Sequence, residues 1–138
     1  AHSITLALCA SGLIFPNTKW VEVVIAISIL IIALENIFQQ KLNSSRLVII
    51  FIFGLIHGMG FANALQELGL PSNFFWGSLI AFNAGVELAQ ISIVLLAWFG
   101  LARWINTKFW YRQRFVTPIS IGIGVIATYW VVERIFTS

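Results

Sequence analysis

The chain has 138 residues, of which 59% are hydrophobic and 9% are charged, and its mean hydropathy is +0.94. This composition excludes a water-soluble globular core and is typical of a polytopic membrane protein. In such a chain the net charge of +3 reports on orientation and lipid headgroups, and it does not indicate a nucleic-acid partner. A single cysteine excludes an internal disulfide and a cysteine-rich metal site.

Long apolar runs separated by polar or turn-forming residues predict an all-α fold, a polytopic transmembrane helical bundle with five spans. One transmembrane domain is expected to cover residues 1–138, with spans at about 1–15, 20–38, 47–68, 74–102 and 115–136. The chain begins inside an apolar run with no charged region before it, which is not the pattern of a signal peptide. We therefore expect this domain to be N-terminally truncated, with six or more spans in the full protein.

The first span carries one stripe of polar and small side chains, spaced at i, i+3, i+7 and i+10 along a helix. Its members are His2, Thr5, Cys9 and Gly12. One interpretation makes His2 and Cys9 ligands or relay groups of an ion pathway. The alternative makes Cys9 a small apolar filler between helices.

The second span has an acidic residue near each end, Glu22 at its start and Glu35 beside Asn36 at its end. Glu35 is only six residues from Lys41. We therefore expect Glu35 to pair or to extend toward the headgroups, and we expect the same of Glu22.

The third span places His57 near the middle of an apolar run, where it should lie close to the midplane of the bilayer. At about 100° per residue, Gly54 and Gly60 flank His57 on the helix surface by about 60° on either side. Gly54 and Gly58 have the small-residue spacing that lets membrane helices approach closely, so these three glycines predict helix packing. A charged side chain at this depth costs about 2.5–3.5 kcal/mol, so we expect His57 to have an interaction partner or a functional role. The alternative is a neutral imidazole bonded to a neighbouring hydroxyl or amide.

The fourth span has two distinct faces and is therefore expected to be central in the bundle. Asn83, Glu87 and Gln90 recur at i, i+4 and i+7 and form a polar face. A stripe of small residues for helix packing lies on the roughly opposite side and consists of Gly77, Ala81, Gly85 and Ala89.

The orientation follows from the distribution of charge. Loops 39–46 and 103–114 are on one side of the membrane and hold six of the eight positively charged residues. The positive-inside rule places these loops in the cytoplasm, and the C-terminus and the turn at 69–73 in the periplasm or exterior.

Polar side chains from three spans share a similar expected depth, and they are His2, His57, Asn83, Glu87 and Gln90. Imidazole, carboxylate and amide groups suit borderline divalent metals such as nickel, cobalt, zinc or iron. The same groups suit proton transfer, and they would also serve as hydrogen-bonding groups between packed helices.

Several segments in order along the chain resemble the HupE/UreJ family. They are Ala-His-Ser-Ile-Thr-Leu at 1–6, Val-Glu at 21–22, Ala-Leu-Glu-Asn at 33–36, Phe-Gly-Leu-Ile-His-Gly-Met-Gly-Phe-Ala at 53–62, Phe-Asn-Ala-Gly-Val-Glu-Leu-Ala-Gln at 82–90 and Tyr-Trp-Val-Val-Glu-Arg at 129–134. The resemblance implies a multi-pass protein of the bacterial inner membrane that is associated with nickel supply to hydrogenase and urease and regarded as a nickel or cobalt permease. By motif it assigns His2, His57, Asn83 and Glu87 to the pathway. Gln90, Glu35 and Asn36 come second. Cys9 is a further secondary candidate because of its place on the polar stripe of the first span.

The leading hypothesis is a permease, not an enzyme, that carries Ni²⁺ or Co²⁺ as cargo and has no tightly bound cofactor. Its expected partners are the bilayer, the metal ion, and a second copy or other membrane subunits. The second hypothesis is a non-transporting scaffold, in which His57 bonds to a carbonyl or hydroxyl and no cavity exists at the midplane. The third is an intramembrane metalloenzyme, which needs at least three tight protein ligands.

Overall fold

The computed structural model describes residues 1–38, 45–67, 74–108 and 110–137. Its helices are α1 (His2–Ala10), α2 (Thr18–Phe38), α3 (Ser45–Glu67) and α4 (Phe75–Ala97), and α4 continues through a π-helical turn, η2 (Trp98–Ala102), into α5 (Arg103–Ile105). A second π-helical turn, η3 (Arg112–Val116), leads into α6 (Thr117–Thr137). These described residues contain no strand, so the expected all-α class is confirmed.

Among the described residues, four helical segments are long and apolar enough to cross a membrane, and they are Thr18–Phe38, Ser45–Leu65, Phe75–Ile105 and Arg112–Phe136. The expected first span forms only the nine residues of α1, against the about 20 that a crossing requires. Gly12 ends this helical stretch, because its φ of 74° is a left-handed conformation that glycine adopts without strain. A count of five spans is therefore not confirmed, and the expected turn at 69–73 and most of the loop at 39–46 lie outside the described residues.

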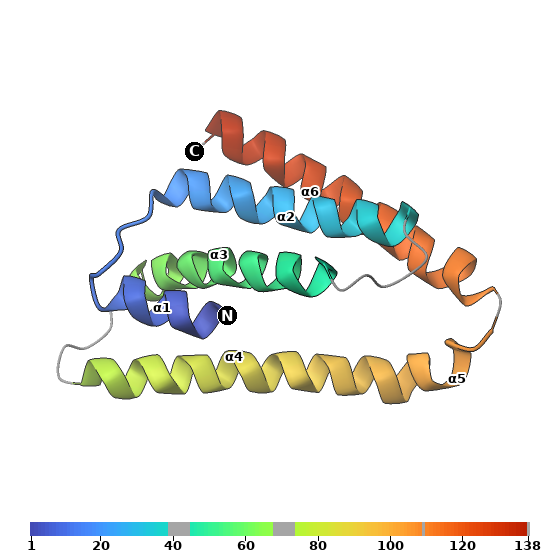
Figure 1. Cartoon of the computed structure of the whole chain (residues 1–138), viewed down its shortest axis with the longest axis horizontal. Helices are drawn as coiled ribbons and strands as arrows, with labels where there is room; N and C mark the ends of the chain where they lie inside the picture. Colours follow the sequence, from blue (N-terminus) through green and yellow to red (C-terminus); the bar gives the residue numbers. More distant parts are fainter. Residues whose placement is uncertain (39–44, 68–73, 109, 138) are drawn as a thin grey trace.

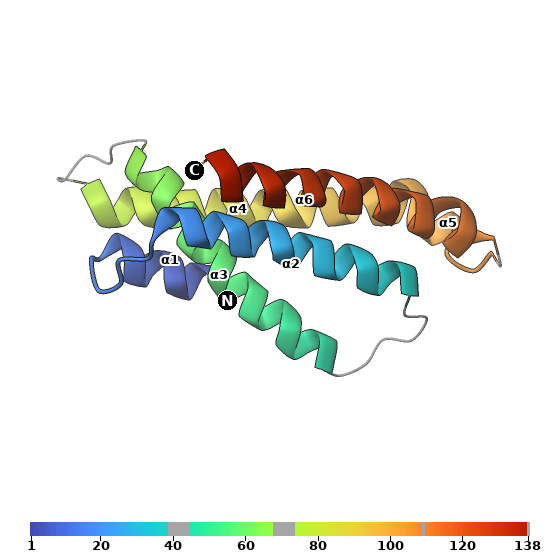
Figure 2. The same cartoon turned by 90° about the horizontal axis from the view of Figure 1, so that it is seen from above.

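Helices α1 and α3 lie between the pair α2 and α6 on one side and α4 on the other (Figure 1), and α3 runs obliquely to the other long helices (Figure 2). Helices α2 and α6 pack along each other, α3 packs against α2, and α1 lies on α3. Helix α4 packs against α1 at the edge of the bundle, on the side away from α6 (Figure 1). The fourth span is thus not central, and Leu79 is the one side chain that it buries. Lipid tails cover apolar side chains as well as protein does, so the apolar composition of α4 did not reveal its position.

Helix α1 lies close against α3 at two glycines. A Cβ at Gly58 would overlap the carbonyl oxygen of His2 and the hydroxyl of Thr5, and one at Gly54 would come within 2.9 Å of the Ala1 Cβ. The Thr5 hydroxyl donates a hydrogen bond of 2.6 Å to the Leu55 carbonyl oxygen across the contact. Backbone approach and an interhelical hydrogen bond together hold α1 in place.

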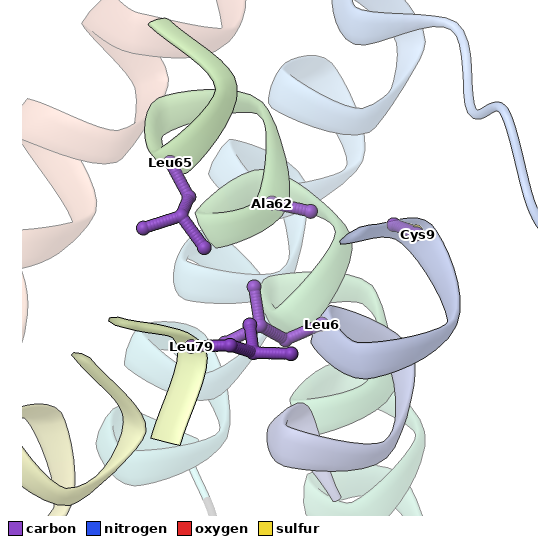
Figure 3. Packing of buried hydrophobic residues seen from close by; sticks show 5 residues of the cluster. All are labelled: Leu6, Cys9, Ala62, Leu65 and Leu79. Atoms are coloured by element: carbon purple, nitrogen blue, oxygen red, sulfur yellow. The ribbon is translucent and has the colours of Figure 1, made fainter. Parts of the chain in front are cut away.

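A small apolar core lies beside this contact and joins α1, α3 and α4 (Figure 3). It consists of Leu6, Cys9, Ala62, Leu65 and Leu79. Cys9 is only 2% exposed and is surrounded by aliphatic groups, which is the packing role that the alternative interpretation gives it.

Helices α2 and α6 also meet through small side chains. Ala33 lies opposite Gly124, where an added Cβ would be 3.7 Å from the Ala33 Cβ. Ser28, Ser120 and Ala127 are buried. Small side chains therefore allow the two helices to run close together at these positions.

We expect Gly58→Val to lower the melting temperature of the purified protein in detergent, because overpacking of this kind costs about 1–3 kcal/mol. Gly85→Val is the matched control: it adds the same β-branched side chain to a helix, but no atom of the described residues lies within 4 Å of the added Cβ. Thermal unfolding followed by size-exclusion chromatography measures both. Equal losses in the two variants would contradict the close approach at Gly58.

Candidate ion pathway

His57 lies near the middle of α3, twelve residues after Ser45 and ten before Glu67. Its Nδ1 is 2.8 Å from the carbonyl oxygen of Phe53, one turn earlier on the same helix. A carbonyl oxygen only accepts, so Nδ1 donates, and Nε2 of the neutral ring keeps its lone pair. Histidines that bind metals are commonly oriented in this way, by a hydrogen bond from the other ring nitrogen to a backbone carbonyl.

Two cavities meet at His57. The first has a volume of about 410 Å³, and its polar lining residues are His2, Ser28, Asn36, His57, Gln90 and Ser120, which come from α1, α2, α3, α4 and α6. The second has a volume of about 330 Å³ and is lined by Glu22, Gly60, Trp130 and Arg134. His57, Phe61 and Ile29 line both cavities and so form their common wall.

His2 contributes a second imidazole to the first cavity. Its Nε2 is buried and has no hydrogen-bond partner among the described residues. The ring packs edge-on against Phe61, with ring centroids 6.1 Å apart and an interplanar angle of 76°. A buried polar nitrogen without a partner is unfavourable, so this nitrogen is suited to bind a water molecule or an ion in the cavity.

Asn83 and Glu87 lie elsewhere, in a third cavity of about 490 Å³ between α1 and α4. The Ser3 hydroxyl donates a hydrogen bond of 3.2 Å to the Glu87 carboxylate. The Oδ1 atom of Asn83 is buried and has no hydrogen-bond partner in the described part of the chain. The five polar residues of similar expected depth are thus divided: His2, His57 and Gln90 share one cavity, and Asn83 and Glu87 share another.

No preformed metal cluster is found in the residues that the structure describes, where no three His, Cys, Asp or Glu side chains are grouped to hold an ion. His2 and His57 line one cavity with amide and hydroxyl groups and no carboxylate. Such a lining suits weak, exchangeable binding of a borderline metal ion better than a tight structural or catalytic site.

Arginines pair with the two acidic residues of α2, as expected for carboxylates near the headgroups. Glu22 is 3.2 Å from Arg134 on α6, and Glu35 is 3.5 Å from Arg46 on α3. Arg46 also donates a short hydrogen bond to the Asn36 side-chain oxygen. An ion pair therefore connects one end of α2 to α6, and another connects the other end to α3.

Arg112 adds hydrogen bonds at the C-terminal end of α2, where Glu35 pairs with Arg46. Its guanidinium group donates hydrogen bonds of 3.1 Å to the carbonyl oxygens of Asn36 and Ile37, in the last turn of α2. A cation at the C-terminal end of a helix satisfies unpaired carbonyls and complements the helix dipole.

Sequence reasoning did not select Ser28, Ser120, Arg46 and Arg134 for the pathway. Ser28 is seven residues from Glu35, nearly two helical turns, and this spacing was the available sign that it shares the polar face of α2. The two arginines gave no comparable sign, because their partners are on other helices.

One family model, described as HupE / UreJ protein, matches residues 1–134. No match was found among curated proteins or among solved structures. The matched residues include the four helices that are long and apolar enough to span a membrane, apart from the last two residues of the fourth. The chain therefore belongs to the HupE/UreJ family.

Proposed function

We propose that this protein is a permease of the bacterial inner membrane that moves a divalent transition-metal ion, Ni²⁺ or Co²⁺, past His57. The observation that carries the proposal is the position of this imidazole. It is in the middle of a spanning helix and at the wall between two cavities, and its Nδ1 is held by a backbone carbonyl so that Nε2 remains for a ligand. Membership of the HupE/UreJ family supports the same function.

The pathway runs through the second cavity to His57 and then through the first cavity, where His2, Asn36 and Gln90 are the further polar groups. The positive-inside rule makes the Glu22 end periplasmic and the Glu35 end cytoplasmic. Few and neutral ligands favour transport, because an ion that is bound too tightly is not released.

In this proposal Glu87 and Asn83 act at a separate cavity, away from His57. They face the cavity between α1 and α4, and Ser3 orients the Glu87 carboxylate. Their contribution to transport is therefore independent of the imidazole at position 57, and it comes from negative charge and amide oxygen on the α4 side.

A second candidate function is a membrane scaffold that does not transport ions. The bond from His57 to the Phe53 carbonyl fits this function, and so does the position of α4 at the edge of the bundle, where other membrane helices have access to it. The cavities on both sides of His57 fit the permease better.

We expect His57→Ala to abolish nickel-dependent urease activity in a reporter strain that lacks its own importer, and millimolar external nickel to restore it. Glu87→Gln is expected to reduce the activity less, since it leaves the His57 cavities intact. Tyr129→Phe, at an exposed position on α6, is the control, and all variants are compared at matched membrane expression. A wild-type chain that fails to support urease activity would favour the scaffold, and full activity of His57→Ala would remove this residue from the pathway.

The division of the polar residues between cavities predicts which double variants are non-additive. In uptake assays with proteoliposomes, His2→Ala combined with His57→Asn should deviate from additivity in kcat/KM by more than about 0.5 kcal/mol, because the two rings share a cavity. Glu87→Gln combined with His57→Asn should be additive within about 0.5 kcal/mol. The reverse result would mean that Glu87, not His2, works together with His57.

A further inference from the structure

The two acidic residues of α2 lie near opposite ends of the helix, and Glu22 lines one of the two cavities. Glu22 and Glu35 are thirteen residues apart, which is about 20 Å along a helix. Glu22 lines the second cavity, and Asn36, next to Glu35, lines the first. His57 lies on the wall between these cavities. Glu22 lines the second cavity, and Glu35 is one residue from the lining of the first; we call these two positions the mouths of the proposed pathway.

At the Glu22 mouth, in the second cavity, Arg134 already forms an ion pair with the carboxylate. The Nε atom of Arg134 is 3.2 Å from Oε2 of Glu22, and both residues line the second cavity. The two side chains are 35% and 44% exposed. Water screens such a pair and weakens it, so another cation is able to displace the guanidinium group.

At the Glu35 mouth, the carboxylate is only partly satisfied. Oε2 of Glu35 is buried and has no hydrogen bond from the residues that the structure describes, although the Nε atom of Arg46 is 3.5 Å away. The guanidinium group of Arg46 instead donates its hydrogen bond to the Asn36 side chain. A buried carboxylate oxygen without a donor is a strong point of attraction for a cation.

We infer that Glu22 and Glu35 are cation-binding sites at the two mouths of the pathway, and that Arg134 and Arg46 are built-in competitors for them. This inference rests on the permease function proposed above. When an arginine holds the carboxylate, the mouth is closed to cations by charge. When the arginine moves away, the carboxylate is free to receive a divalent ion of the nickel or cobalt type.

The ion pairs at the two mouths differ in solvent exposure, and this difference sets which pair exchanges its arginine for an ion first. The Glu35 and Arg46 side chains are 11% and 20% exposed, well below the values for Glu22 and Arg134. The less screened pair at the Glu35 mouth separates less readily, and Arg112 holds the same end of α2. The Glu22 mouth is therefore the one that exchanges its arginine for an ion first.

A pair of variants separates a competitor from a structural ion pair, because both variants break the same interaction. Glu22→Gln should raise the KM for Ni²⁺ uptake into proteoliposomes by about threefold or more, and Arg134→Gln should lower it by about threefold or more. Tyr129→Phe, at an exposed position on the same helix as Arg134, is the control, with KM unchanged. If both Glu22→Gln and Arg134→Gln raise KM, or if neither changes it, the inference is overturned.

The Glu35 mouth is tested in the same way. Glu35→Gln should raise the KM for Ni²⁺ uptake, and Arg46→Gln should lower it. Arg46→Lys keeps the positive charge and should leave KM near the wild-type value. Shifts of KM in the same direction for Glu35→Gln and Arg46→Gln would reject a binding site at Glu35.

Equilibrium binding of Co²⁺ to the purified protein, measured by calorimetry, distinguishes this inference from the permease proposal. Opposite shifts in Kd for Glu22→Gln and Arg134→Gln, without uptake by the wild-type protein, would keep the mouth sites and reject transport. Uptake by the wild-type protein without opposite shifts in Kd would keep the permease and overturn the mouth sites.

Discussion

The contact between α1 and α3 at Gly58 brings the two imidazoles of the chain to one cavity. The backbone of α1 lies directly on this glycine, where any side chain would overlap the His2 carbonyl oxygen. His2 and His57 follow from the same contact, one on each helix, and both line the first cavity. A larger residue at position 58 would move α1 away and separate the two rings. The glycine therefore shapes the site without contributing a ligand to it.

Helix α2 provides the other side of both cavities, and its two ends are held differently. One end has a half-exposed ion pair with α6, whereas the other has a more buried pair with α3 and two further hydrogen bonds from Arg112. The two ends of α2 are therefore held by separate sets of contacts. This asymmetry fits the permease proposed above, because a transporter must keep one side closed while the other exchanges its ion.

The sequence by itself determined the all-α membrane class, most of the long helices and the central place of His57. Hydropathy and helical periodicity report these properties directly, because they depend on neighbours along one helix. The resemblance in residues 53–62 and 82–90 also led to the family that the whole-chain match supports. The length of α1 was overestimated, because the left-handed turn at Gly12 depends on backbone conformation that an apolar run does not reveal.

Only the tertiary structure decided how the polar residues are grouped. Equal depth along the membrane normal placed Glu87 with His57, but depth leaves open which neighbour each helix faces. The structure puts α4 at the edge, against α1, so Glu87 meets Ser3 and lines a cavity of its own. It also pairs Glu22 with Arg134 across 112 positions of the chain. Such contacts between distant helices depend on packing, which hydropathy cannot specify where lipid and protein are equally apolar.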